Sequence, residues 1–296
     1  MLRRPSRAEL RQWLDGYLFA LPFLIGFIVF FLFPMVYSAW LAFQKWDLIG
    51  SPEFVGLKNI TRALSDELAT KSLYNSAYYT VIAVPLQLIL AFLIALALTQ
   101  NIKFKALYRA GFYMPIIIPV VATAVVWQRV FHPDSGIINN LLAIFGVPAQ
   151  RWLSDPDMSK PAFIFMSLWS IGRMMVIFIA GLGNIPTSLL EAASIDGAGK
   201  LRQTLSITVP LMTPLILYNS IIALINSFQT WVPADIMTEG GPENSTLFVV
   251  LNIYRQGFKF FNMGYASALA WELFAIVMGL TLVQFISSRK WVYYEQ

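Results

Sequence analysis

Residues 188–197 read Ser-Leu-Leu-Glu-Ala-Ala-Ser-Ile-Asp-Gly, and this charged interval lies between two apolar segments of membrane-spanning length. The run through Glu191 is rich in residues with high helix propensity, whereas Gly197 favours a helix end. A polar segment between two lipid-spanning segments has to face water or another protein. The sequence therefore predicts a short exposed helix around Glu191. The alternative from the residues alone is an ordinary solvated loop.

The composition around this interval is that of an integral membrane protein. Hydrophobic residues make up 57% of the 296 residues, charged residues make up 12%, and the mean hydropathy is +0.63. Six apolar stretches reach the roughly 20 residues that a spanning helix needs. They are residues 17–43, 73–99, 107–130, 163–183, 205–232 and 266–286. We predict an all-α, polytopic transmembrane bundle with six spans.

The distribution of basic residues predicts the orientation in the membrane. With the N-terminus inside, 11 of the 21 Lys and Arg residues fall in the short inner segments and 9 in the longer outer loops. Because Lys and Arg concentrate in short cytoplasmic loops, both termini and the Glu191 interval are expected in the cytoplasm. The net charge of +5 then reflects topology and not nucleic-acid binding.

Few residues are available for catalysis. The chain has no cysteine and one histidine, His132, so thiolate chemistry is excluded and metal chemistry has little support. The Gly199-Lys200 step is followed by Leu201 and lacks the Ser or Thr of a phosphate-binding loop. We expect no enzyme activity, no metal site and no cofactor in this chain.

Three outer loops separate the spans. Residues 44–72 are polar, residues 137–147 form an apolar patch too short to span and suited to a surface or re-entrant helix, and Glu239-Gly240-Gly241-Pro242 is a strong turn signal. We divide the chain into residues 1–72, with the leader, first span and first outer loop; a core at 73–288; and a tail at 289–296.

Polar residues inside the predicted spans mark a candidate solute path. In the fifth span Asn219, Ala223, Asn226 and Thr230 are spaced 4, 3 and 4 apart, which places them on one helical face, with Ser227 beside them. Polar stripes seldom face lipid. Hydrogen bonding between helices is the alternative role.

Two charges also fall within spans, Arg173 in the fourth and Glu272 in the sixth. One interpretation is an intramembrane ion pair, as structure or gate. The other is that Arg173 binds an acidic or phosphorylated saccharide through a bidentate contact.

Several separated motifs resemble one family. Glu191-Ala192-Ala193, a three-residue spacer, Gly197 and then Val209-Pro210 resemble the signature of permease subunits of bacterial binding-protein-dependent ABC importers. Further matches are similar to the first of the two distinct permeases of maltose-type sugar systems. They are Asp196-Gly197-Ala198-Gly199, Gly240-Gly241-Pro242, Phe145-Gly146-Val147, Trp152-Leu153-Ser154-Asp155-Pro156 and Gly264-Tyr265-Ala266-Ser267-Ala268. The resemblance covers about residues 73–288 and suggests the minimal six-helix form, without extra leading spans or a large outer insertion.

The resemblance implies a type I ABC importer permease fold in the cytoplasmic membrane of a bacterium or archaeon. It implies that residues 186–205 form a coupling loop, in which Glu191, Ala192, Ala193, Asp196 and Gly197 dock on a cytosolic ATPase dimer that binds the ATP and Mg²⁺. The other implied partners are a second, non-identical permease, an extracytoplasmic solute-binding protein and a sugar.

Counting back from the Glu191 motif, the resemblance also places Trp169, Ser170 and Arg173 in the cavity that the fifth-span stripe lines.

Two alternatives to a sugar permease are open. One is the same machinery for an acidic saccharide or a glycerol-phosphate-type solute, and the other is a secondary carrier. A secondary carrier needs sets of intramembrane acids or histidines, and away from the span ends the predicted spans hold only Arg173 and Glu272 as charges.

Overall fold

The chain is almost entirely helical where it is described. The computed structural model describes the backbone of residues 7–293 and the side chains of residues 11–293. The helices are α1 (Arg7–Phe27), α2 (Phe33–Leu41), α3 (Lys58–Ser65), α4 (Glu67–Thr99), α5 (Lys105–Tyr113), α6 (Val120–Val130), α7 (Ile137–Ile144), α8 (Pro156–Ser167), α9 (Gly172–Gly183), α10 (Thr187–Ile195), α11 (Lys200–Gln203), α12 (Val209–Phe228), α13 (Val232–Met237), α14 (Val249–Tyr254) and α15 (Met263–Ser288).

Short segments of other geometry extend these helices. Three are π-helical, η1 (Ile28–Leu32), η4 (Thr204–Thr208) and η5 (Arg255–Lys259), and two are 3-10 turns, η2 (Met114–Ile116) and η3 (Leu168–Ser170). Strands β1 (Gln44–Lys45) and β2 (Glu53–Phe54) pair in antiparallel fashion, with Gln44 opposite Phe54 and Lys45 opposite Glu53.

The described helices contain four to six candidate membrane spans. Four segments are long and apolar enough to cross a membrane, at Arg11–Leu41, Glu67–Thr99, Lys200–Met237 and Met263–Ser288. Two bent pairs, Lys105–Ile116 with Val120–Val130 and Pro156–Ser170 with Gly172–Gly183, complete six if each pair is one span. The bundle is all-α and polytopic.

The third predicted span, 107–130, is not a straight helix. Its two halves meet at an angle of 99°. Pro119 occupies the N-cap position of α6 with φ −55° and ψ 140°, an extended conformation. Proline has no N–H to continue a helix, and it also disfavours the helical conformation of the preceding Ile118. The bend therefore follows from the sequence at Pro119.

The fourth span begins at Pro156, earlier than predicted, because Asp155 caps α8 by accepting a hydrogen bond from the Asp157 N–H at 2.8 Å. The span then bends by 46° before α9. At the bend, a Cβ on Gly172 would lie 2.4 Å from the carbonyl oxygen of Phe112. A glycine is required there because the start of α9 approaches the backbone at the end of α5 so closely.

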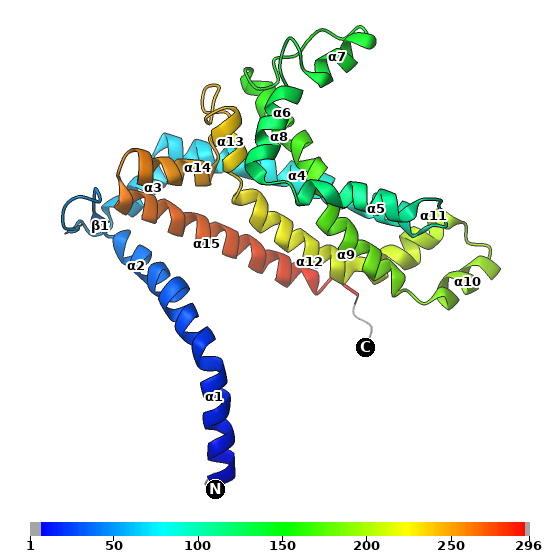
Figure 1. Cartoon of the computed structure of the whole chain (residues 1–296), viewed down its shortest axis with the longest axis horizontal. Coiled ribbons are helices and arrows are strands. Elements are labelled where there is room, and N and C mark those ends of the chain that lie inside the picture. The colour runs from blue at the N-terminus through cyan, green and yellow to red at the C-terminus, as the bar shows by residue number, and fades with distance from the viewer. Residues whose placement is uncertain (1–6, 294–296) are drawn as a thin grey trace. The chain divides into compact units, whose positions relative to one another are not determined.

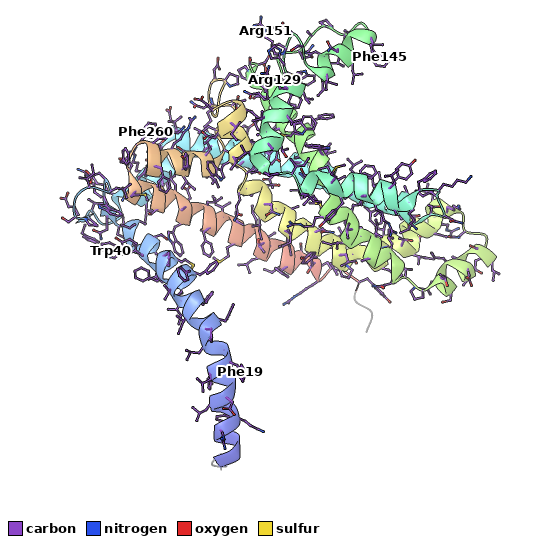
Figure 2. The ribbon with its side chains drawn as sticks, viewed as in Figure 1. Phe19, Trp40, Arg129, Phe145, Arg151 and Phe260 are labelled. Carbon is purple, nitrogen blue, oxygen red and sulfur yellow. The ribbon has the colours of Figure 1, made fainter. Side chains whose placement is uncertain are left out.

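Two compact units divide the chain. The first contains residues 1–63 and 256–271. Its α1, η1 and α2 form an apolar helical segment with exposed side chains such as Phe19, which is 89% exposed (Figure 2). At the start of α15 the N–H of Met263 donates to the Trp46 carbonyl at 3.0 Å, and a Cβ on Gly264 would lie 1.7 Å from the Gln44 carbonyl oxygen. The start of α15 thus packs tightly on the β1 segment.

The second unit contains residues 64–255 and 272–296. Its long helix α4 packs against α9 and α12 (Figure 1). Ala83, Ala91 and Ala95 on the packing face of α4 are 0% exposed. Small side chains permit close approach between helices in lipid, where van der Waals packing replaces the hydrophobic effect as the driving force.

The loop before α14 is held to the first turns of α4. The Asn75 side-chain amide donates to the carbonyls of Asn244 at 2.8 Å and Leu247 at 3.2 Å. The Val249 N–H donates to the Ser76 hydroxyl at 2.9 Å. These bonds satisfy buried backbone groups and give the loop a defined position on the second unit.

Candidate functional site

The predicted exposed helix at Glu191 is α10. It begins at Thr187, and Pro186 occupies its N-cap position without a side-chain capping bond. Thr187 and Ser188 lie in its first turn. The fixed φ of proline favours a chain entering a helix, so the start does not depend on a polar cap.

Gly197 ends α10 through a specific hydrogen-bond pattern. Its φ is +80°, in the left-handed region. The N–H of Ala198 donates to the carbonyl of Ala193 at 2.9 Å, and the N–H of Gly197 donates to the carbonyl of Ser194 at 3.1 Å. This pair of bonds is the Schellman motif, which needs a residue that tolerates positive φ. The spacing from Ala193 to Gly197 in the sequence motif is thus the spacing of a helix and its terminal cap.

A side chain that the sequence analysis missed connects α10 to α11. The amide of Gln203 donates to the Ser194 hydroxyl at 2.9 Å and to the Ala198 carbonyl at 2.8 Å. The Ser194 hydroxyl in turn donates to the Leu190 carbonyl at 2.8 Å. A glutamine nine residues after a serine carries no recognisable signal, so the sequence alone does not reveal this contact.

The outer surface of α10 is open within the described chain. Glu191, Ala192, Asp196 and Gly197 are exposed, and Ala193 is partly buried. Two apolar side chains are exposed beside them, Leu189 at 42% and Ile195 at 88%. Large apolar side chains that stay exposed next to one another can mark a surface for contact with another protein.

A cavity of about 480 Å³, lined by both polar and apolar side chains, lies within the second unit. The residues that line it belong to α4, to both halves of the third span (η2 and α6), to both halves of the fourth span (α8 with η3, and α9), and to α12 and α13. Of the predicted path residues, those that line it are Ser170, Arg173, Asn219, Asn226, Ser227 and Thr230, together with Ala223.

The predicted polar face of the fifth span, Asn219, Ala223, Asn226 and Thr230, differs from the structure at its last residue. Helix α12 stops at Phe228, so Thr230 is not part of the helical face. The Thr230 hydroxyl instead donates to the Asn226 carbonyl at 3.2 Å, and Thr230 still reaches the cavity. Asn219 is only 2% exposed, and its side-chain nitrogen is buried without a hydrogen-bond partner.

Trp169 does not line this cavity. It lines a separate hollow with Leu168 and Ile171 between α4, α5 and η3. Trp169 and Ser170 are successive residues of η3, and successive side chains of a helical turn project to different sides. Ser170 and Arg173 therefore line the 480 Å³ cavity, whereas Trp169 lines the separate hollow beside α5.

The structure does not bring Arg173 and Glu272 together. Arg173 lines the cavity and is exposed, whereas Glu272 in α15 is partly buried and is not among the lining residues. Within the described residues, no hydrogen bond or ion pair joins either side chain to a partner. The predicted ion pair is not formed in this conformation.

Several lining residues escaped the sequence analysis. They are Tyr79 and Gln87 on α4, Thr123 on α6, Ser167 on α8 and Tyr218 on α12. Gln87 carried a usable signal, since it is a polar residue inside an apolar span. Among the described residues no group of three or more His, Cys, Asp or Glu side chains is arranged to hold a metal ion.

The fold is that of a known class of transporter. A chain of a bacterial alginate ABC transporter, solved in complex with an alginate pentasaccharide-bound periplasmic protein, matches with a TM-score of 0.83. The match covers 97% of this chain and 98% of that chain at 22% sequence identity. This likeness shows the fold alone, and the fold is that of a type I ABC importer permease.

Residues 72–293 match the family model described as binding-protein-dependent transport system inner membrane component. The chain belongs to this family. It is 41% identical to the probable ABC transporter permease protein YesP of Bacillus subtilis, over 99% of this chain and 96% of that protein. It is 31% identical to the sn-glycerol-3-phosphate transport system permease protein UgpA of Yersinia pestis, over 98% of this chain and 99% of that protein.

Proposed function

We propose that this chain is the transmembrane permease subunit that carries a sugar or oligosaccharide into the cytoplasm, with energy from a separate ATPase. It pairs with a second, non-identical permease, and a solute-binding protein delivers the sugar from outside. One observation carries the proposal: the exposed helix α10 lies between α9 and α12 in the chain, and both of these helices contribute residues to the 480 Å³ cavity.

The connection between α10 and α12 supports a mechanical role. The segment from Lys200 to Met237 is one nearly continuous helical stretch. Its first turn is tied to α10 through Gln203 and Ser194. A displacement of α10 is therefore transmitted to the helix that carries Asn219 and Asn226. Transport needs such a coupling between a site for energy input and a site for the solute.

The ATPase dimer docks on α10 from the cytoplasmic side. Glu191 pairs with a basic or hydrogen-bonding group of the ATPase, and Ala192, Ala193, Asp196 and Gly197 allow the close approach of its surface. Both termini lie in the cytoplasm with α10. ATP and Mg²⁺ bind to the partner chains, and this subunit holds no cofactor and hydrolyses nothing itself.

The solute-binding protein docks on the outer loops, including Gly240-Gly241-Pro242. The ordered structure of this loop supports a docking role. The N–H of Thr246 donates to the Gly240 carbonyl at 3.2 Å, and the Thr246 hydroxyl donates to the Gly241 carbonyl at 2.8 Å. A preformed loop loses little conformational entropy when it binds a partner.

The lining of the cavity supports a hydroxylated solute. Amide and hydroxyl groups of Asn219, Asn226, Ser227 and Thr230 are suited to hydrogen bonds with sugar hydroxyls, and Tyr79 and Tyr218 offer aromatic surface. The similar proteins named above are described as acting on alginate and on sn-glycerol 3-phosphate. Both compounds are polyhydroxylated, which agrees with the lining.

Charge reversal at Glu191 tests the proposal. When the subunits are co-expressed, Glu191→Lys is expected to abolish co-purification of the ATPase. The substitution places a positive charge opposite the basic group of the ATPase with which the Glu191 carboxylate pairs. Asp134→Lys makes the same change at an exposed residue of the second predicted outer loop and is expected to leave co-purification intact. Undiminished co-purification with Glu191→Lys, or uphill sugar uptake by this chain alone in liposomes, contradicts the proposal.

A further inference from the structure

We propose that the cavity selects an anionic saccharide and that Arg173 binds its carboxylate, phosphate or sulfonate group. This inference rests on the proposed function and specifies the substrate class of the same site. It follows from the charge of the cavity, from the absence of a protein partner for Arg173 within the described residues, and from an unpaired donor on the same lining.

The cavity carries one kind of charge. Of the described residues that line it, Arg173 is the single charged side chain, and no Asp or Glu is among them. A guanidinium within a membrane protein is costly unless it is paired or hydrated. A neutral solute entering this cavity would displace water from Arg173 without replacing its charge interaction. An anionic solute supplies that interaction.

Arg173 does not act as a contact between helices in this structure. An arginine with that role is buried and hydrogen-bonded to a neighbouring helix. Arg173 is exposed and, in the described part of the chain, has no hydrogen bond or ion pair with another side chain or carbonyl. Its five N–H donors are therefore available for a ligand oxyanion, which a guanidinium binds in bidentate geometry.

Arg173 lies beside the bend of the fourth span. It is in the first turn of α9, directly after the 46° bend. Ser170 lies three residues earlier and lines the same cavity.

Asn219 provides a second, independent indication of a ligand. Its side chain is 2% exposed, it lines the cavity with Arg173, and its Nδ2 has no hydrogen-bond partner. Buried side-chain amides almost always have a partner. A solute oxygen on the α12 side of the cavity would accept this bond, so Arg173 and Asn219 are suited to hold one solute from two helices.

Equilibrium binding to the purified permease and ATPase complex in nanodiscs, without the binding protein, tests the proposal. The probes are trigalacturonate and the same trisaccharide with its carboxylates reduced to hydroxymethyl groups. The wild-type complex is expected to bind the acidic probe at least tenfold more tightly, the range of a charge-assisted hydrogen bond. Glycerol 3-phosphate and a sulfonated hexose, each against its neutral parent, distinguish phosphate and sulfonate from carboxylate.

Variants assign the preference to Arg173. Arg173→Gln is expected to lose about tenfold or more in affinity for the acidic probe and to leave the reduced probe unchanged. Arg173→Lys is expected to retain part of the preference for the acidic probe. Lysine keeps the positive charge but lacks the planar guanidinium that binds an oxyanion in bidentate geometry. Arg129→Gln is the matched control. Arg129 lies on α6 near the end that leads to α7 (Figure 2), is exposed, and is not among the cavity-lining residues.

The possible outcomes distinguish failure of the anionic-substrate inference from failure of the proposed sugar-import function. Equal binding of acidic and neutral probes by the wild-type complex overturns this inference but leaves sugar import intact. If Arg173→Gln fails to assemble, Arg173→Lys decides, because a purely structural arginine gives no preference for the acidic probe in either protein. Binding of none of the probes, with no sugar-stimulated ATP hydrolysis, overturns the inference and the proposed function together.

Discussion

The side-chain amide of Gln203 donates to the hydroxyl of Ser194 at 2.9 Å and fixes the end of α10 to the start of the helical stretch that becomes α12. Its second bond, to the Ala198 carbonyl at 2.8 Å, closes the turn between the two helices. Gln203 thus connects α10 directly to the helical stretch that contains α12. The contact has no counterpart in the motifs by which the loop was recognised.

We expect Gln203→Ala to weaken coupling without preventing ATPase docking. It removes two hydrogen bonds, each worth about 0.5–1.5 kcal/mol, and leaves the exposed surface of α10 unchanged. The ATPase should still co-purify, while sugar uptake per ATP hydrolysed falls several-fold. Arg202→Ala is the neighbouring control, since Arg202 is exposed. Equal coupling ratios in wild type and Gln203→Ala would contradict this account of the turn.

A second prediction concerns Gly197, whose φ of +80° allows the terminal cap of α10. Gly197→Ala places a Cβ in the left-handed region, at a cost of about 1–2 kcal/mol. We expect a frayed α10 and at least severalfold weaker association with the ATPase, measured by titration. Gly197→Asn should retain more affinity, because asparagine tolerates this conformation. Gly199→Ala is the control, since Gly199 has φ −65° and open space for a Cβ.

A third prediction tests the packing behind Arg173. Gly172→Ala would place a Cβ 2.4 Å from the Phe112 carbonyl oxygen and 2.9 Å from the Tyr113 Cα. Such overpacking costs typically about 1–3 kcal/mol, so the thermal unfolding temperature of the purified subunit should fall. Gly183→Ala, at the other end of α9, meets no atom within 4 Å and should be nearly neutral. An equal effect of the two substitutions would argue against the close approach of α9 to α5.

A fourth prediction concerns the loop that contains α7. Asn139 is 4% exposed and bonds the carbonyls of Pro133 and Gln150, the Gln150 N–H and the Trp152 indole N–H, at 2.8 to 3.1 Å. Asn139→Ala leaves these groups unpaired, at about 1–3 kcal/mol for each one that stays buried. We expect limited proteolysis to cut this loop faster. Asn140→Ala, at the adjacent exposed position, should show the wild-type rate.

Much of the fold was predictable from composition and length. Apolar stretches of about 20 residues predicted six spans, and the structure has four such helices, or six if each bent pair is one span, because lipid requires that the backbone satisfy its own hydrogen bonds. The sequence did not predict the 99° bend at Pro119. Proline is tolerated within many membrane helices, as at Pro85 in α4 and Pro214 in α12, so its presence alone does not distinguish a kink from a break.

The site was predictable where a periodic pattern existed. The α12 stripe of Asn219, Ala223 and Asn226 lines one cavity because residues three and four apart share a helical face. Trp169 was placed in the cavity by the family resemblance and not by a periodic pattern, and it lines the separate hollow instead. The contact of Gln203 with Ser194 depends on the tertiary position of α11, which no local pattern encodes.

Labelling of a single cysteine in α10 tests the central claim most directly. The chain contains no cysteine, so Ala192→Cys introduces a unique thiol at an exposed position of α10. We predict that a membrane-impermeant maleimide does not label it from outside intact cells, labels it in inside-out vesicles stripped of the ATPase, and labels it at least tenfold more slowly once the ATPase is restored. Labelling from outside the cell, or the same rate with and without the ATPase, would contradict the assignment of α10 as the coupling element.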